Sequence, residues 1–161
     1  MKTLEVLDKY KKILSPILQV NSEDISFWVD YMLIGKITYD KKNDEFVKNW
    51  NLGTYEVKVK INDKYVQVST FKLYQLPHCC AFMVSCNALV MPEFRGKRIG
   101  TILNSLRQDI GRLLGYSAIL CTDIEQNNNQ RKLLKTNGWK DIYSLVNKRT
   151  NNRVYISVIN I

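Results

Sequence analysis

The stretch that decides the expected fold is Leu89-Val90-Met91-Pro92-Glu93-Phe94-Arg95-Gly96-Lys97-Arg98-Ile99-Gly100. An apolar strand ends at its proline, a basic loop follows, and an amphipathic helix begins near Ile99. The first turn of a helix has backbone N–H groups without partners inside the helix, and together with the helix dipole they form an anion site. The loop adds the positive charges of Arg95, Lys97 and Arg98. The stretch therefore predicts a site for a pyrophosphate.

The neighbouring residues predict a strand, a crossover helix and a second strand. Residues 79–91 are almost wholly apolar, as a central strand covered on both faces should be. From Ile99 to Leu114 apolar residues recur at helical spacing, and residues 117–122 form another apolar strand. Residues 79–123 are thus expected to form a parallel βαβ unit.

The rest of the chain predicts helices and antiparallel hairpins around this unit. The expected elements are a helix over residues 4–19, a helix that starts at Asn21-Ser22-Glu23-Asp24 and continues through Leu33, a loop with one helical turn over 36–53, a hairpin over 54–74 that turns at Asn62-Asp63, a short basic helix over 127–137 closed by Gly138, and a final hairpin of 141–147 and 153–161. The expected fold class is α/β (α+β), with a mixed, mostly antiparallel sheet, a central βαβ unit and helices on both faces.

Composition indicates one globular domain. The chain has 161 residues, of which 45% are apolar and 24% charged. No apolar run is long enough to span a membrane and the start lacks a signal-peptide block, so we expect a cytoplasmic protein. Of the net charge of +9, residues 1–80 carry +2 and residues 81–161 carry +7, and every arginine lies in the second half. Such a field attracts an anionic partner: a nucleotide cofactor, an acidic protein surface or nucleic acid.

Cysteine spacing does not predict a metal site. The four cysteines, Cys79, Cys80, Cys86 and Cys121, match no zinc pattern. We interpret them as reduced thiols that behave as small hydrophobic residues, and we expect no metal.

The run from Arg95 to Gly100 resembles the central motif of the GNAT superfamily, the acetyl-CoA-dependent N-acetyltransferases. That motif is a strand, then Arg or Gln, two residues, Gly, one residue, and Gly or Ala, opening a helix. Downstream, Asn127 and the pair Gly138-Trp139 stand where the family places an Asn after the next strand and a Gly-aromatic pair after a short helix. The resemblance covers residues 79–140.

The resemblance implies one GNAT-like domain over residues 1–161, with a variable part at 1–75, an acetyl-CoA-binding core at 79–140 and a C-terminal hairpin at 141–161. Acetyl-CoA would be the co-substrate. The residues that the resemblance assigns to it are Ala88, Leu89 and Val90 for the pantetheine arm and thioester, Arg95, Gly96, Lys97, Arg98, Ile99, Gly100 and Thr101 for the pyrophosphate, and Asn127 for the pantetheine arm.

Two positions depart from the family pattern. The middle glycine of the motif is Arg98 here, and we expect Arg98 to adopt a helical conformation that does not need glycine. The tyrosine that many members use to reprotonate the leaving thiolate is replaced by Leu134, which cannot donate a proton. Tyr116 and Tyr143 are nearby aromatic residues, but neither matches that position.

The catalytic base is predicted less specifically. Asp123 and Glu125 follow the second strand of the βαβ unit, at the end that should face the cleft, and they are the candidates for a base or for holding the amine. Glu93 is a further carboxylate near the cleft. The only histidine, His78, lies at the far end of its strand from the pyrophosphate loop.

The expected function is transfer of an acetyl group from acetyl-CoA to a primary amine. The acceptor stays open among a protein lysine, a protein N-terminus and a small amine, and the chain could be a monomer or a homodimer. One alternative is a GNAT-fold protein that acts on or binds nucleic acid or a nucleic-acid-associated protein, although no recognised nucleic-acid motif is present. The other is a non-catalytic domain that binds CoA or a protein partner, for which Arg98 and Leu134 are the reasons.

Overall fold

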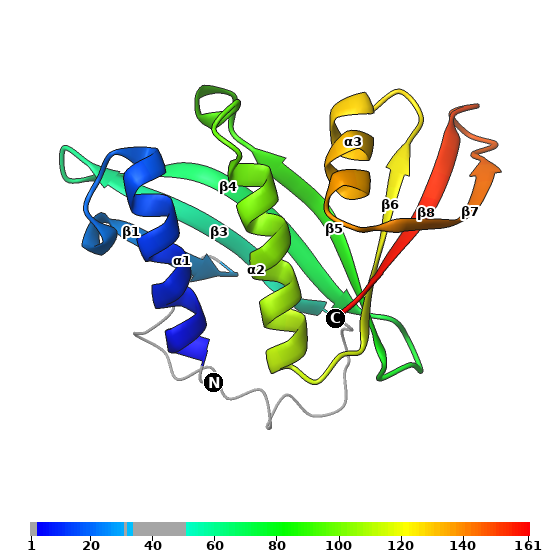
Figure 1. Cartoon of the computed structure of the whole chain (residues 1–161), viewed down its shortest axis with the longest axis horizontal. Helices are drawn as coiled ribbons and strands as arrows, with labels where there is room; N and C mark the ends of the chain where they lie inside the picture. Colours follow the sequence, from blue (N-terminus) through cyan, green and yellow to red (C-terminus); the bar gives the residue numbers. More distant parts are fainter. Residues whose placement is uncertain (1–2, 31, 34–50) are drawn as a thin grey trace.

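The computed structural model describes residues 3–30, 32–33 and 51–161 (Figure 1). Within these residues eight strands form one sheet in the order β2-β1-β3-β4-β5-β6-β8-β7. The helices and strands are α1 (Thr3–Leu18), β1 (Ile25–Val29), β2 (Met32–Leu33), β3 (Asn51–Ile61), β4 (Lys64–Gln75), β5 (Phe82–Val90), α2 (Ile99–Leu113), β6 (Ala118–Ile124), α3 (Asn128–Thr136), β7 (Lys140–Val146) and β8 (Arg153–Asn160). Neighbouring strands are antiparallel except β5 and β6, which are parallel. This mixed sheet with a central β5-α2-β6 unit confirms the predicted fold class.

The predicted helix after Asn21 is wrong. The chain makes only a 3-10 turn, η1 (Ser22–Asp24), and then strand β1, which pairs with β3. Ile25, Phe27 and Val29 are buried and alternate along the strand, so this short apolar segment is a strand once β3 is its neighbour. Of the loop expected over residues 36–53, residues 36–50 lie outside the described residues, and Asn51 already belongs to β3.

The predicted hairpin over 54–74 is confirmed as strands β3 and β4. Asn62 and Asp63 form its turn with φ values of 48° and 62°. Two consecutive residues with positive φ are what a tight two-residue hairpin turn requires, and Asn and Asp tolerate this conformation.

Strands β5 and β6 pair over only part of their length. The parallel register joins Phe82 to Ala118 and ends at Val84 and Leu120, although both strands continue beyond that point. On its other side β5 carries a bulge against β4, where Asn87 has a φ of 51°. The bulge increases the local twist. The two strands therefore separate towards their carboxyl ends, and the expectation that 79–91 is covered on both faces is wrong beyond the bulge, where Asn87 to Leu89 are exposed.

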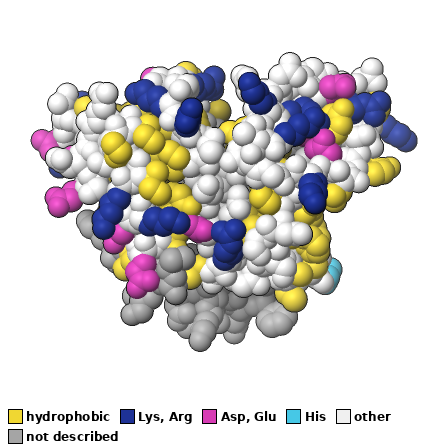
Figure 2. All heavy atoms as spheres, viewed as in Figure 1, with side chains coloured by type: hydrophobic (Ala, Val, Ile, Leu, Met, Phe, Trp, Pro, Cys, Tyr) yellow, Lys and Arg dark blue, Asp and Glu magenta, His cyan; other side chains and the backbone are white. Residues whose placement is uncertain are grey.

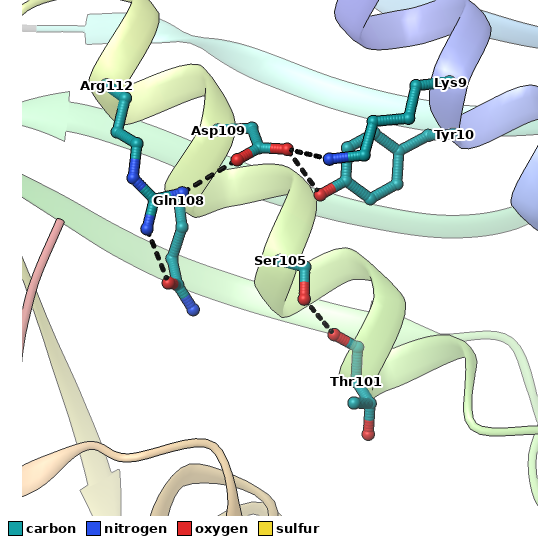
Figure 3. Close-up of polar contacts among 7 residues, drawn as sticks. All are labelled: Lys9, Tyr10, Thr101, Ser105, Gln108, Asp109 and Arg112. Atoms are coloured by element: carbon teal, nitrogen blue, oxygen red, sulfur yellow. Dashed lines mark hydrogen bonds and ion pairs between the residues drawn. The ribbon is translucent and has the colours of Figure 1, made fainter.

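All three helices of the described residues lie on one face of the sheet, so the expectation of helices on both faces is not met there (Figure 1). Ile119 of β6 faces α2, because a side chain added at Gly111 would contact it. Asp123, on the same side of β6, forms an ion pair with Arg131 of α3. Helices α1 and α2 pack side by side, and polar contacts at Asp109 join them (Figure 3).

The carboxyl-terminal third agrees with the sequence prediction. Helix α2 ends before Gly115, which has a φ of 83°, and Gly138 closes α3 with the same φ. Strands β7 and β8 form the final hairpin. No helix in the described part of the chain combines the length and the apolar character needed to cross a membrane.

Candidate functional site

A cleft of about 600 Å³ opens where β5 and β6 separate, between the start of α2 and helix α3. It brings together all but one of the residues predicted to bind the cofactor, namely Ala88, Leu89, Val90, Arg95, Gly96, Arg98, Ile99, Gly100, Thr101 and Asn127. The exception is Lys97, which is exposed and whose ammonium lies 6.0 Å from the centre of the Phe94 ring. Figure 2 shows the molecule hollowed at the upper edge of this face, with Lys and Arg side chains on both sides of the hollow.

The loop before α2 presents a row of unpaired backbone amides to this cleft. The N–H groups from Gly96 to Gly100 have no acceptor within the described residues, whereas those of Thr101 and Ile102 donate to the carbonyl of Arg98. Gly96 has a φ of 79°. The Arg95 side chain fixes the loop to the strand, because its Nε donates to the carbonyl of Val90 at 3.0 Å. The loop is thus a preformed anion cradle with two exposed guanidinium groups beside it.

Arg98 does not have the helical conformation expected from the sequence. It is the N-cap of α2 and has a φ of 59° and a ψ of 12°, which is the left-handed region that favours glycine. The prediction that no glycine was needed here is therefore wrong. The side chain is exposed and lines the cleft, so the position combines a strained backbone with a positive charge that faces the site.

Helix α3 forms the opposite wall of the cleft and lies close to the start of α2. A side chain added at Gly100 would come within 2.8 Å of a methyl group of Leu133, so glycine permits this close packing. Asn127 caps α3 by accepting a hydrogen bond from the amide of Gln130 at 3.3 Å, and it also lines the cleft. This leaves the Asn127 side-chain NH₂ to act as a donor towards a ligand.

The separated strands supply the remaining wall. Beyond Val84 no residue of β5 pairs with β6, so the edge of β5 that faces the cleft carries unpaired N–H and C=O groups. Ala88, Leu89 and Val90 lie on this edge and line the cleft. An extended ligand with amide groups can form hydrogen bonds to such an edge in the way that an added strand would.

The two carboxylates predicted as bases do not line the cleft. Asp123 accepts a hydrogen bond from Arg131 at 3.0 Å, and Arg131 also donates to Asp141 at 2.9 Å. Burial raises the pKa of Asp123 and Asp141 raises it further, against the opposing charge of Arg131. Glu125 is exposed and accepts from the hydroxyl of Tyr155 at 3.4 Å. Asp123 thus holds α3 against the sheet, and Glu125 is the more accessible of the two.

No tyrosine, histidine or carboxylate of the described residues lines the cleft. Leu134 is 2% exposed and belongs to the core. Tyr116 donates its hydroxyl to Gln75 at 2.9 Å, and Tyr143 is exposed on the edge strand β7. His78 lies in the turn between β4 and β5, at the opposite end of β5 from the loop. The described lining of the cleft therefore contains hydrogen-bond donors and positive charge, but no tyrosine, histidine or carboxylic acid that could protonate a thiolate.

The sequence interpretation missed two polar residues on the buried side of α2. Arg107 lines the cleft, and Asn104 lies beneath it. The signal was available, because Arg107 is four residues after Leu103 and three before Ile110, on the same apolar stripe. A polar residue within such a stripe indicates either a buried network or a site.

Several solved structures that share this fold are acetyltransferases. The IAA acetyltransferase from Bacillus cereus superposes with a TM-score of 0.56 at 14% identity, over 70% of this chain and 79% of the other. The spermidine N-acetyltransferase from Vibrio cholerae, in complex with CoA and spermine, has a TM-score of 0.59 at 17% identity, over 70% and 66% of the two chains. A probable GNAT-family acetyltransferase from Chromobacterium violaceum has a TM-score of 0.58 at 16% identity, and this chain covers 58% of its length.

These similarities confirm the predicted resemblance at the level of the fold: the chain has the fold of the GNAT acetyltransferases. No family model matches the sequence, and no curated protein matches it.

Proposed function

We propose that this protein transfers an acetyl group from acetyl-CoA to a primary amine. The observation that carries the proposal is the row of unpaired amides from Gly96 to Gly100, which shares one cleft with the unpaired edge of β5. The first feature suits a pyrophosphate and the second suits the amide-containing pantetheine arm. The fold shared with a CoA-bound spermidine N-acetyltransferase supports the same assignment.

In this mechanism the chain mainly binds and orients the reactants. The diphosphate lies against the amides at the start of α2, with Arg95 and Arg98 beside it, and the arm runs along Ala88 to Val90. A backbone N–H on this edge polarises the thioester carbonyl. The amine nitrogen attacks the carbonyl carbon, the C–N bond forms and the C–S bond breaks. The amine loses its proton and the CoA thiolate gains one from solvent.

We propose Glu125 as the base, acting through water, in preference to Asp123. Glu125 is exposed and its hydrogen bond from Tyr155 is long, whereas Asp123 is held by Arg131. An exposed carboxylate can take a proton from a water chain that reaches the amine.

CoA binding is the first test, and it compares substitutions of two neighbouring cations of the loop, Arg98 and Lys97. Arg98 lines the cleft and Lys97 does not, and asparagine tolerates the left-handed backbone at position 98. We expect CoA to raise the melting temperature, and we expect Arg98→Asn to weaken CoA binding about 10-fold and Lys97→Asn about 2-fold. Absence of any shift with millimolar CoA would contradict the proposal.

Turnover with a panel of primary amines is the second test. We expect acetylation of at least one amine, and a lower rate for Glu125→Gln at neutral pH. The lack of a proton donor in the cleft favours one other candidate, a domain that binds CoA without catalysis. Tight CoA binding with no turnover on any amine would support that candidate.

A further inference from the structure

Among the described residues, the buried positive charge of Arg107 has no negative partner. Its side chain is 3% exposed, and its three hydrogen bonds go to neutral acceptors, the Leu103 carbonyl at 3.3 Å, the Ser85 hydroxyl at 2.8 Å and the Asn104 side-chain oxygen at 3.4 Å. No carboxylate in the described part of the chain forms an ion pair with it. The neighbouring Cys121 does not supply the charge, because burial raises the pKa of its thiol to about 12.

Asn104 provides a second, independent sign of a missing acceptor. This residue is completely buried, and its side-chain oxygen accepts from Trp139 Nε1 at 2.9 Å as well as from Arg107. Its side-chain NH₂ has no hydrogen-bond partner among the described residues. A guanidinium has five N–H donors, and only three are used here. The cluster formed by Ser85, Asn104, Arg107 and Trp139 therefore has more donors than acceptors.

Arg107 is the member of this cluster that reaches the cleft. Arg107 lines the same cleft as the loop before α2, and its partner Ser85 directly follows Val84, the last residue of β5 that pairs with β6. Arg107 follows Ile99 by eight residues, which corresponds to about 12 Å along the helix axis. A ligand with its diphosphate at the start of α2 can therefore reach the guanidinium with its acyl end.

We propose that the preferred acyl donor carries a carboxylate at the far end of its acyl group, as in a succinyl or malonyl thioester, and that Arg107 binds this carboxylate while Asn104 holds the guanidinium from beneath. An acetyl group ends in a methyl group and leaves the free N–H groups of Arg107 without an acceptor. A carboxylate supplies the missing negative charge and accepts from the guanidinium through two oxygens. The inference rests on the proposed function for the CoA thioester in this cleft, and it replaces acetyl by a carboxylate-ended acyl group as the preferred group transferred.

The carboxylate takes no part in the bond changes. The amine nitrogen bonds to the thioester carbonyl carbon as the C–S bond breaks, the nitrogen loses one proton and the CoA thiolate gains one. The carboxylate leaves with the product amide. The same site recognises the donor rather than the amine, because Arg107 shares its cleft with the amides that suit the diphosphate.

The experiment compares the affinities of CoA, acetyl-CoA and succinyl-CoA by titration calorimetry. We expect the unmodified protein to bind succinyl-CoA at least about 10-fold more tightly than acetyl-CoA. Arg107→Met should remove this preference and change the affinity for acetyl-CoA less than about 3-fold. Arg112→Met is the matched control, because Arg112 is a half-exposed arginine of the same helix that pairs with Asp109 and does not line the cleft. It should keep the preference.

A second variant keeps the test valid if Arg107→Met does not fold. Asn104→Asp places a carboxylate beside the guanidinium within the protein. We expect this variant to lose the preference for succinyl-CoA as well, because Arg107 then has an internal partner.

Three outcomes would overturn the inference. The first is equal affinity of the unmodified protein for acetyl-CoA and succinyl-CoA. The second is a preference that survives both Arg107→Met and Asn104→Asp. The third is stabilisation by free succinate or an amino acid that equals that by succinyl-CoA at the same concentration, which would assign the site to the acceptor. If no CoA compound binds, the proposed function itself fails, and this is distinguishable from CoA binding without a preference.

Discussion

Helix α2 carries a partly buried carboxylate, Asp109, on one side and a buried guanidinium, Arg107, on another, and the two charges differ in their partners. On the side that faces α1, the carboxylate of Asp109 accepts from Lys9 at 2.9 Å, from the Tyr10 hydroxyl at 2.9 Å and from Arg112 at 2.8 Å (Figure 3). On the side that faces the sheet, the partners of the Arg107 guanidinium within residues 3–30, 32–33 and 51–161 are all neutral.

The difference in partners indicates that Asp109 contributes to folding and that Arg107 is available to a ligand. Burial alone would raise the pKa of Asp109, but the hydrogen bonds from Lys9, Tyr10 and Arg112 hold it below its ordinary value, so the carboxylate is stabilised as an anion. Burial instead lowers the pKa of Arg107 to about 10. A charge satisfied by its own chain contributes to folding, whereas a buried charge without a counter-ion costs stability unless a ligand supplies one.

The largest expected change in stability is on the side of α2 that faces α1. Asp109→Ala removes the acceptor for the buried Tyr10 hydroxyl and the partner of two cations, so we expect the free energy of unfolding to fall by about 2 kcal/mol. Urea denaturation of both proteins measures this, with Asp8→Ala as a control, since the Asp8 side chain is 64% exposed and its pair with Lys11 is 3.8 Å long. A loss no larger than that of the control would contradict the comparison.

A gain in stability is expected for a substitution on the side of α2 that faces the sheet. Arg107→Met removes an unpaired buried charge and keeps an unbranched apolar chain, so we expect the free energy of unfolding of the ligand-free protein to rise by about 1 kcal/mol. Thermal and urea denaturation without CoA measure the change. Destabilisation as large as that of Asp109→Ala would mean that the two sides of α2 do not differ and that Arg107 is a structural residue.

The smallest expected effect is at the start of the same helix. Arg98 has a φ of 59°, so Arg98→Gly relieves backbone strain, although glycine also increases the entropy of the unfolded chain. We expect a net gain of about 0.5 kcal/mol in the free energy of unfolding. Arg95→Gly, at a position with an ordinary φ of −70°, should destabilise instead. A loss of stability in Arg98→Gly would show that the arginine side chain holds the loop.

Much of the fold followed from short-range patterns. The hairpin turn at Asn62 and Asp63, the start of α2 and the cap at Gly115 all depend on residues that are neighbours in the chain, and the structure agrees with each. The helix expected after Asn21 rests on a helix-start signal before an apolar segment, which is local information. The segment Ile25–Val29 is instead a strand, because it pairs with β3, a contact over about thirty residues.

The candidate site also has a part that the sequence predicts and a part that only the fold shows. The loop from Arg95 to Thr101 could be located from the sequence, because its chemistry is that of consecutive amides and cations. The left-handed backbone of Arg98 could not, since it follows from how the loop joins β5 to α2. The neutral surroundings of Arg107 could not be predicted either, because they depend on which side chains of β5 and β6 lie next to it in the fold.

The sequence by itself determined the order of the elements around the βαβ unit and the position of an anion-binding loop at the start of α2. Only the tertiary structure decided that β5 and β6 separate after Val84, that Asp109 has cationic partners and that Arg107 has no anionic partner in the part of the chain that the structure describes. The physical reason is that local backbone preferences act between neighbouring residues, whereas burial and charge pairing depend on groups that the fold brings together from distant parts of the chain.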